Sequence, residues 1–234
     1  MIYFAHRGAS ARRVQNTLEA FRLARRLGAS CYELDVHLTQ DGQLVVHHDY
    51  SLLATAGKDA KIGELPWAQL RRCALQNRFD GAPAFIPLLQ EVLPVVAPGL
   101  ELLNIELKND ANCYPGLEEK LLKLLAGEYA ELLSKTLFSS FDYDTLLRIR
   151  KLNKNARIGL LTRSFDVSKA LDLQAESVHL NYTRFSPATA EECHQNGLKT
   201  YLYTVNDISL AKRLQQEGAD GIFTDYIDLF VSEH

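Results

Sequence analysis

Short apolar runs with β-strand character alternate with longer amphipathic segments along most of the chain. This alternation predicts a parallel sheet, because each helix returns the chain to the edge where the next strand begins. Eight such units favour a closed (β/α)8 TIM barrel of the α/β class over an open doubly wound sheet. We predict the eight main strands at Ile2–His6, Cys31–Leu38, Glu101–Leu107, Thr136–Ser140, Arg157–Leu161, Ser177–Asn181, Lys199–Val205 and Gly221–Thr224.

Helical patterns separate these strands, and residues that favour helix ends flank some of them. Ser186 is typical of an N-cap before Pro187, and Asp207 and Gly218 suit the two ends of a later helix. A chain of 234 residues is ordinary for an α/β barrel, so residues 1–234 are expected to form a single domain. We predict helices at Thr17–Leu27, Leu117–Leu133, Tyr143–Leu152, Pro187–Gln195 and Ile208–Glu217.

One segment interrupts the pattern after the second main strand. Asp41-Gly42 is a hairpin turn signal, and Gln43–His48 has the pattern of an extra short strand. Residues 49–86 then show little strand pattern and contain the only tryptophan, Trp67. Irregular segments of this length are usually functional or form a small subdomain. We therefore expect a small insertion at about residues 49–86, beside the active face of the barrel.

Composition excludes several classes of partner. The formal net charge is −3, so no basic excess points to nucleic acid or to an anionic membrane surface. No apolar run approaches the roughly 20 residues that span a bilayer, and the first residues show no secretory leader, so we expect a cytoplasmic protein without a transmembrane segment. The cysteines are expected to be reduced, because none forms a CxxC pair: Cys31, Cys73, Cys113 and Cys193.

Acidic residues interrupt two strands that should be continuously apolar. Glu33 and Asp35 are two residues apart, so both side chains point to one side of their strand, and Glu106 interrupts the next main strand. An unpaired carboxylate on an inward face costs several kcal/mol of desolvation, so each needs a cation or a hydrogen-bond donor. Polar residues at the carboxyl ends of barrel strands are typical of an active site.

The charges at these strand ends predict a bound cation. The three carboxylates sum to −3, whereas the neighbouring Arg7 and Lys108 supply +2, so the site would repel an anionic substrate. One divalent cation changes the balance to +1, which complements a phosphodiester. Oxygen ligands without cysteine suit a hard ion such as Mg²⁺ or Ca²⁺.

Histidines at strand ends supply groups that titrate near neutral pH. His6 ends the first strand, and His47 and His48 end the extra strand. Adjacent residues on a strand face opposite ways, so only one of His47 and His48 should enter the site, and the spacing does not select between them. Phe141 follows the fourth main strand and is a candidate for the pocket wall.

In their order along the chain, several motifs resemble those of the glycerophosphodiester phosphodiesterase family. They are AHRGAS at 5–10, NTLEAF at 16–21, ELDVHLTQDGQLVVHHD at 33–49, IPLLQEVL at 86–93, NIELK at 104–108, FSSFD at 138–142, TVND at 204–207 and GADGIFTDY at 218–226. The chain differs from the usual pattern at Gln15, where the family has glutamate, and at Tyr203, where it often has tryptophan.

The resemblance implies a catalytic (β/α)8 barrel with a small insertion after the second strand, in a cytoplasmic bacterial-type enzyme. It implies hydrolysis of a glycerophosphodiester to glycerol 3-phosphate and an alcohol. By this resemblance His6 and His48 are the acid–base pair. The remaining implied roles are metal ligation by Glu33, Asp35 and Glu106, phosphate binding by Arg7 and Lys108, and substrate contact by Phe141 and Tyr203.

Three alternative functions remain open at this point. A phospholipase of the D type acting on lysophospholipids would need an apolar lip, for which the insertion offers Leu52, Leu53, Trp67 and Phe79. A catalytically silent phosphodiester-binding protein should have lost acids or histidines that are present here. A metal-dependent barrel hydrolase of amides or sugars often uses several histidine ligands, whereas the ligands here carry oxygen.

Overall fold

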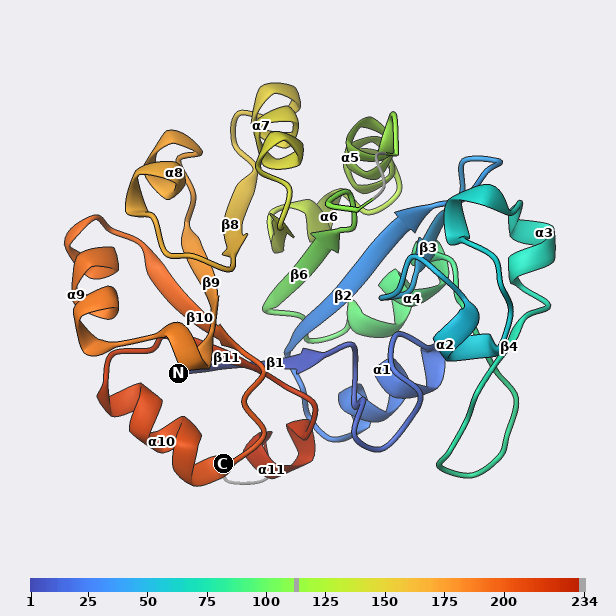
Figure 1. Cartoon of the computed structure of the whole chain (residues 1–234), viewed down its shortest axis with the longest axis horizontal. Coiled ribbons are helices and arrows are strands. Elements are labelled where there is room, and N and C mark those ends of the chain that lie inside the picture. The colour runs from blue at the N-terminus through green and yellow to red at the C-terminus, as the bar shows by residue number, and fades with distance from the viewer. Residues whose placement is uncertain (112–113, 232–234) are drawn as a thin grey trace.

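The computed structural model describes residues 1–111 and 114–231 of the chain. Eight parallel strands form a closed barrel, because β1 pairs with β11 on one side and with β2 on the other. Figure 1 shows the helices around the outside of these strands. The predicted TIM barrel is thus confirmed. Its strands are β1 (Ile2–His6), β2 (Cys31–Leu38), β6 (Leu102–Leu107), β7 (Thr136–Ser140), β8 (Arg157–Thr162), β9 (Ser177–Asn181), β10 (Lys199–Tyr203) and β11 (Gly221–Thr224).

Several of the helices on the outside of the barrel begin at conventional N-caps. The side chains of Thr17, Asp142, Ser186 and Asp207 each accept a hydrogen bond from a main-chain N–H in the first turn. In the described residues, no helix is both long enough and apolar enough to cross a membrane. The helices are α1 (Leu18–Arg26), α4 (Leu89–Val96), α5 (Leu117–Gly127), α6 (Ala130–Leu133), α7 (Tyr143–Leu152), α8 (Val167–Asp172), α9 (Pro187–Gln195), α10 (Ile208–Gln216) and α11 (Ile227–Val231).

Three predicted elements differ from the structure by more than one residue at an end. The single helix expected at Leu117–Leu133 is wrong, because α5 ends at Gly127 and α6 starts at Ala130. Between them Tyr129 leaves the helical region, with φ −129° and ψ 38°, and its hydroxyl donates to the Gln90 carbonyl at 3.1 Å. The strand expected at Lys199–Val205 ends at Tyr203, and the one at Gln43–His48 is reduced to β3 (Leu44–Val46).

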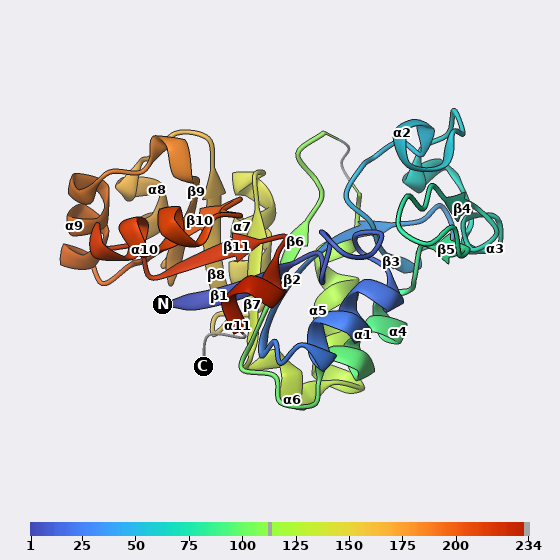
Figure 2. The ribbon, with the colours of Figure 1, turned by 90° about the horizontal axis from the view of Figure 1, so that it is seen from below.

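The segment between β3 and α4 forms a small unit with its own core. β3 pairs antiparallel with β2, and short elements follow it. Figure 2 shows this segment gathered beside β3 at one side of the barrel. Its buried apolar side chains include Leu52, Ile62, Leu70 and Ile86. The elements are α2 (Leu53–Ala56), the 3₁₀ helix η1 (Ile62–Glu64), α3 (Trp67–Leu70), β4 (Ala74–Leu75) and β5 (Ala84–Phe85).

Alternate residues of the barrel strands share one face, and the character of that face changes along the strands. A buried apolar cluster takes one residue from each of six strands: Phe4, Cys31, Leu102, Leu137, Tyr201 and Phe223. Two or four residues further along β1, β2 and β6, the same face carries His6, Glu33, Asp35 and Glu106. The alternation therefore gives the barrel an apolar layer and places ionisable groups toward the carboxyl ends of the strands.

Truncation in this apolar layer should be costly to stability. Phe4 is fully buried, and its ring lies 4.6 Å from that of Phe223 and 5.2 Å from that of Tyr201. We expect Phe4→Ala to lower the free energy of unfolding by about 3–5 kcal/mol, because it leaves a cavity between these rings. Leu152→Ala is the control, since Leu152 is 47% exposed and should change stability by less than about 0.5 kcal/mol. Equal urea midpoints for the two variants would contradict this expectation.

Candidate active site

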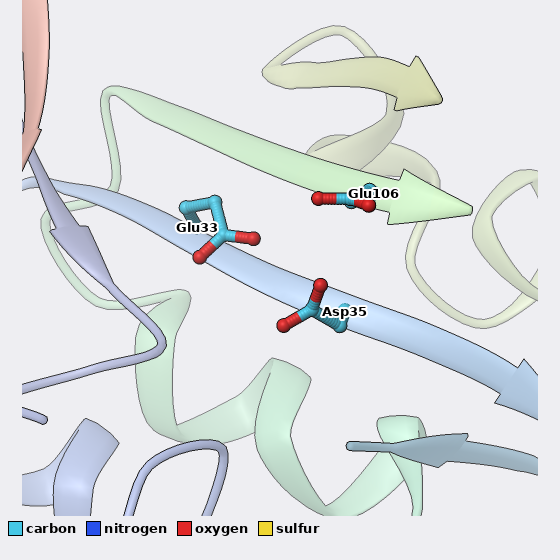
Figure 3. Close-up of side chains that lie close together, drawn as sticks. All are labelled: Glu33, Asp35 and Glu106. Atoms are coloured by element: carbon cyan, nitrogen blue, oxygen red, sulfur yellow. The ribbon is translucent and has the colours of Figure 1, made fainter. Parts of the chain in front are cut away.

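Three buried carboxylates converge at the carboxyl ends of two neighbouring strands. Glu33 and Asp35 come from β2 and Glu106 from β6, where the strand register sets Asp35 beside Glu106. One oxygen from each carboxylate lies within 4.8 Å of the others, and Figure 3 shows the three groups turned toward one another. Their residues are 3%, 0% and 8% exposed, respectively. Oxygens at this spacing match the donor set of a hard divalent cation.

Asp35 is the carboxylate with the most partners. Arg7 Nε lies 3.2 Å from Asp35 Oδ2, and Lys108 Nζ lies 3.7 Å from Oδ1 and 2.8 Å from Glu106 Oε1. The Asn16 amide also donates to Asp35 Oδ2 at 2.8 Å. Two cations therefore serve three buried carboxylates.

The remaining charge imbalance appears in the pKa values of the acids. Burial raises the pKa of Glu33 well above its ordinary value, and the Asp35 carboxylate raises it further. The same two causes raise the pKa of Glu106. Burial alone would also raise the pKa of Asp35, but Arg7 and Lys108 outweigh it and hold that pKa below its ordinary value. The mutual repulsion of the carboxylates is what a divalent cation would relieve.

The turn after β1 fixes Arg7 against this cluster. The main-chain N–H of Arg7 donates to Glu33 Oε2 at 2.9 Å, and Arg7 itself has a left-handed φ of 58°. Gly8 follows with φ 81°, and a Cβ there would lie 2.7 Å from the carbonyl carbon of Ala20. Only glycine fits this close approach to α1. The turn thus directs both the amide and the guanidinium of Arg7 to the carboxylates.

His6 is held from behind by a carboxylate that follows β11. Its Nδ1 lies 2.7 Å from Asp225 Oδ1, and its Nε2 lies 3.9 Å from Glu33 Oε2. Burial, and then the charge of Arg7, lower the pKa of His6 below the ordinary 6.5. Because a carboxylate only accepts hydrogen bonds, Nδ1 carries the proton, and Nε2 is the nitrogen that faces the carboxylate cluster.

Of the two adjacent histidines, the structure turns His48 to the central cavity and His47 away from it. His48 lines that cavity, and its Nδ1 lies 2.7 Å from Asp49 Oδ1, which leaves Nε2 for the site. His47 is buried, and its Nε2 lies 3.1 Å from Thr55 Oγ1 in α2. His37 helps to fix the main chain of His48, because its Nε2 lies 3.3 Å from the His48 carbonyl oxygen.

The central cavity has a volume of about 150 Å³ and collects most of the candidate residues. Phe141 and Tyr203 form part of its wall, with perpendicular rings 6.2 Å apart. Asp35 and Lys108 join the cluster through their ion pairs. The candidate residues on the cavity wall are His6, Arg7, Glu33, His48, Glu106, Phe141 and Tyr203.

The sequence analysis assigned no site role to three polar residues that complete the cluster. Asp225 contacts His6, Asn16 donates to Asp35, and the side-chain oxygen of Gln15 accepts from Arg7 Nη1 at 2.7 Å. Asp225 directly follows β11, so its place after a barrel strand was the available signal. The buried His179, which also lines the cavity, bonds to Ser177 at 2.9 Å and is a satisfied core histidine.

Asp225 should act as a positioning residue for His6. Its Oδ1 accepts from His6 and Ser10, and its Oδ2 accepts from Asn206. In an asparagine at this position, the NH2 group would replace one of these acceptors and face another hydrogen-bond donor. We expect Asp225→Asn to lower kcat by about 10²-fold through misplacement of the imidazole. Asp220→Asn is the matched control, because Asp220 forms a His–Asp pair with His194 at the surface. Similar phosphodiesterase activity in the two variants would refute this role.

Comparison with known proteins places this site in a family. Residues 6–229 match the model of the glycerophosphoryl diester phosphodiesterase family. A glycerophosphodiester phosphodiesterase of Caldanaerobacter subterraneus is 35% identical over 229 residues, which are 96% of this chain and 93% of that protein. One from Bacillus altitudinis is 32% identical over 96% of this chain and 94% of its own length.

Solved structures agree with the sequence relatives. An Oleispira antarctica phosphodiesterase in complex with the product sn-glycerol-3-phosphate superposes with a TM-score of 0.89 at 29% identity, over 100% of this chain and 97% of that one. A Thermotoga maritima glycerophosphodiester phosphodiesterase gives 0.81 at 28% identity, over 100% and 98%. The chain therefore belongs to the glycerophosphoryl diester phosphodiesterase family, and it is an enzyme of the phosphoric diester hydrolase class.

Proposed function

We propose that this enzyme hydrolyses glycerophosphodiesters to glycerol 3-phosphate and an alcohol, with one divalent cation and two histidines. The observation that carries this proposal is the buried carboxylate cluster, which lies beside two cations and has imidazoles from two different strand ends at its cavity. The product named for the Oleispira antarctica structure supports the choice of substrate.

The donor set fits a hard cation. Glu33, Asp35 and Glu106 would hold Mg²⁺ or Ca²⁺, because their oxygens are the only kind of donor in the described cluster. Arg7 and Lys108 do not balance the three negative charges. When bound, the cation supplies positive charge to a non-bridging phosphate oxygen.

Arg7 and Lys108 are suited to bind the phosphodiester. Arg7 lines the central cavity, and Lys108 forms an ion pair with Glu106, which also lines it. As negative charge builds on the phosphoryl oxygens in the transition state, fixed cations at this position stabilise it without reorganisation. Phe141 and Tyr203 would then contact the glycerol carbons, and polar side chains of the cavity would form hydrogen bonds with the glycerol hydroxyls.

His6 and His48 would divide the proton transfers between their Nε2 atoms. One removes a proton from the nucleophile, which is a water or the glycerol hydroxyl of the substrate, and the other protonates the leaving alcohol. In both residues an aspartate at Nδ1 fixes the ring and leaves Nε2 toward the cavity.

We infer that residues 1–234 form one catalytic barrel domain and that residues 49–86 are an insertion at the rim of this site.

A second candidate is a lysophospholipase D activity. A lysophospholipase D of Rattus norvegicus is 24% identical over 96% of this chain and 83% of its own length. Of the proposed apolar lip, Leu52 is buried, but Leu53 is 57% exposed in a groove of about 610 Å³ that His48 and Phe141 also line. An acyl chain in this groove would lie directly beside the cavity. Release of choline from lysophosphatidylcholine would support this activity, and its absence would reject it.

The test of the main proposal is a panel of glycerophosphodiesters assayed for glycerol 3-phosphate. We expect the enzyme to release glycerol 3-phosphate from several members with a free glycerol moiety and from none that lack it. A chelator in a parallel series should suppress every positive member. Hydrolysis only of diesters without glycerol would overturn the proposal, whatever the effect of chelation.

A further inference from the structure

A second groove, of about 490 Å³, lies beside the mouth of the barrel. Its walls come from the turn after β1, from the insertion, and from the segments that follow β10 and β11. Among the described residues, it shares no lining residue with the central cavity. We call it the arginine groove, and its hydrogen-bonding side chains include Arg13, Gln15, Thr55, Gln76, Arg78 and Tyr226.

The arginine groove carries two guanidinium groups that are not in ion pairs with described residues. Arg13 donates to a neighbouring carbonyl, and the guanidinium of Arg78 lies over the Phe79 ring at 5.3 Å. Asp80 is close enough to interact with Arg13, but its carboxylate accepts hydrogen bonds from Asn77 and from the main chain instead. Both arginines thus keep most of their donors for a ligand.

The one carboxylate among the residues that line the arginine groove is already occupied. Asp225 accepts hydrogen bonds from His6 and Ser10 at one oxygen and from Asn206 at the other. The groove therefore has a net positive charge, and amide and hydroxyl groups stand beside the guanidinium groups. This combination matches a phosphate or carboxylate group, because guanidinium donors pair with both oxygens of such anions.

Two hydrogen bonds between side chains join the arginine groove to the active site. Asp225 lines the groove and accepts from His6, and Gln15 lines the groove and accepts from Arg7 at its side-chain oxygen; His6 and Arg7 both line the central cavity. A diester bound against Arg7 has two alcohol groups, and the central cavity of about 150 Å³ has room for a small one. Gln15 is the groove residue that contacts Arg7, the residue proposed to bind the phosphate.

The other groove beside the cavity suits an anion less well, because its cations already have acidic partners. Asp49 bonds to His48 at 2.7 Å, and Lys108 is held by Glu106 at 2.8 Å. The other cation of that groove, Arg163, has Asp110 at 3.6 Å. An anionic group would therefore find its partners in the arginine groove.

We propose that the arginine groove binds the alcohol half of the diester and selects alcohols that carry a second anionic group. This inference rests on the proposed function, since it assigns the alcohol side of the same site. Arg13 and Arg78 would contact the anion, and Gln15 would lie between it and the phosphodiester.

The test compares two diesters that differ by one terminal phosphate group, which adds about two negative charges near neutral pH. Both join glycerol 3-phosphate to propane-1,3-diol, and one carries a terminal phosphate on the diol. We expect the wild-type kcat/KM to be about tenfold higher for the phosphorylated diester. A preference of this size is typical of charged hydrogen bonds that solvent partly screens. The double variant Arg13→Gln, Arg78→Gln should reduce this ratio to about one. Arg26→Gln, an exposed arginine on α1 outside the groove, is the control and should keep it.

The ratio makes the result independent of folding, because a partly misfolded variant loses activity on both diesters alike. A wild-type ratio near one, or a tenfold ratio that survives in the double variant, would overturn the assignment of the groove. Added salt should lower the wild-type ratio, since exposed charges are screened. Failure of the wild type to hydrolyse either diester would instead contradict the proposed function.

Discussion

Replacing His6 by alanine is expected to lower kcat by about 10²–10⁴-fold, the usual contribution of one positioned acid or base. KM should change far less, because Arg7 and Lys108, which bind the phosphodiester in our proposal, stay in place. His48→Ala should have an effect of similar size, since His48 lines the same cavity. Asp49 bonds to its Nδ1, which leaves Nε2 for proton transfer. Rates are measured as glycerol 3-phosphate released from a glycerophosphodiester at saturation.

A matched histidine variant separates this role from a general effect. His194 also pairs with an aspartate, Asp220 at 2.9 Å, but it lies in α9 with a side chain that is 46% exposed. His194→Ala should leave kcat within about twofold, as expected for a surface change away from the site. The double variant of His6 and His48 should lose less than the product of the two single losses, because the two groups act in one reaction. Near-normal turnover by His6→Ala would remove His6 from the mechanism.

The barrel was predictable because its strands are short, buried and apolar. β1, β2, β7, β9 and β11 have the predicted bounds, since a polar residue at or directly after its last position ends each apolar run. The pattern gave no bounds for α4 and α8. α4 contains Pro94, which sequence reasoning takes as a helix breaker, and α8 has only six residues.

Cys113, one of the four cysteines expected to be reduced, lies outside the described residues, and the other three are buried and free.

The predictable part of the site is the part that alternation along a strand determines. Glu33 and Asp35 share a face because they are two residues apart, and the pairing of β2 with β6 adds Glu106. The place of Asp225 after a strand could suggest a site residue, but its contact with His6 was not predictable, because the two lie 219 positions apart and only the pairing of β1 with β11 brings them together. The choice between His47 and His48 depends on which ring the end of β3 turns inward, and the spacing of adjacent residues does not contain that information.

Removing divalent cations should abolish most of the activity. Without the cation, three buried carboxylates face the phosphodiester with only Arg7 and Lys108 to balance them. A metal ion contributes several kcal/mol to charge stabilisation in such reactions, so chelation by EDTA should lower kcat/KM by about 10²-fold or more. Adding back Mg²⁺ or Ca²⁺ should restore the activity, and Zn²⁺ should restore it less well because the donors are oxygens.

Thermal unfolding provides a second measure of cation binding that does not require substrate. A ligand that binds only the folded protein stabilises it by about 2.7 kcal/mol at a concentration of 100 times its Kd. Mg²⁺ or Ca²⁺ should therefore raise the Tm of the EDTA-treated enzyme, and Glu106→Gln should remove this rise by deleting one ligand charge. Glu176→Gln is the matched control, because Glu176 pairs with Arg157 at 2.7 Å outside the cluster, and it should keep the rise. Because Glu33, Asp35 and Glu106 are buried together, a cation bound among them must stabilise the fold. An equal rise in Tm for Glu106→Gln and the wild type would therefore place the cation elsewhere, even if EDTA stopped catalysis.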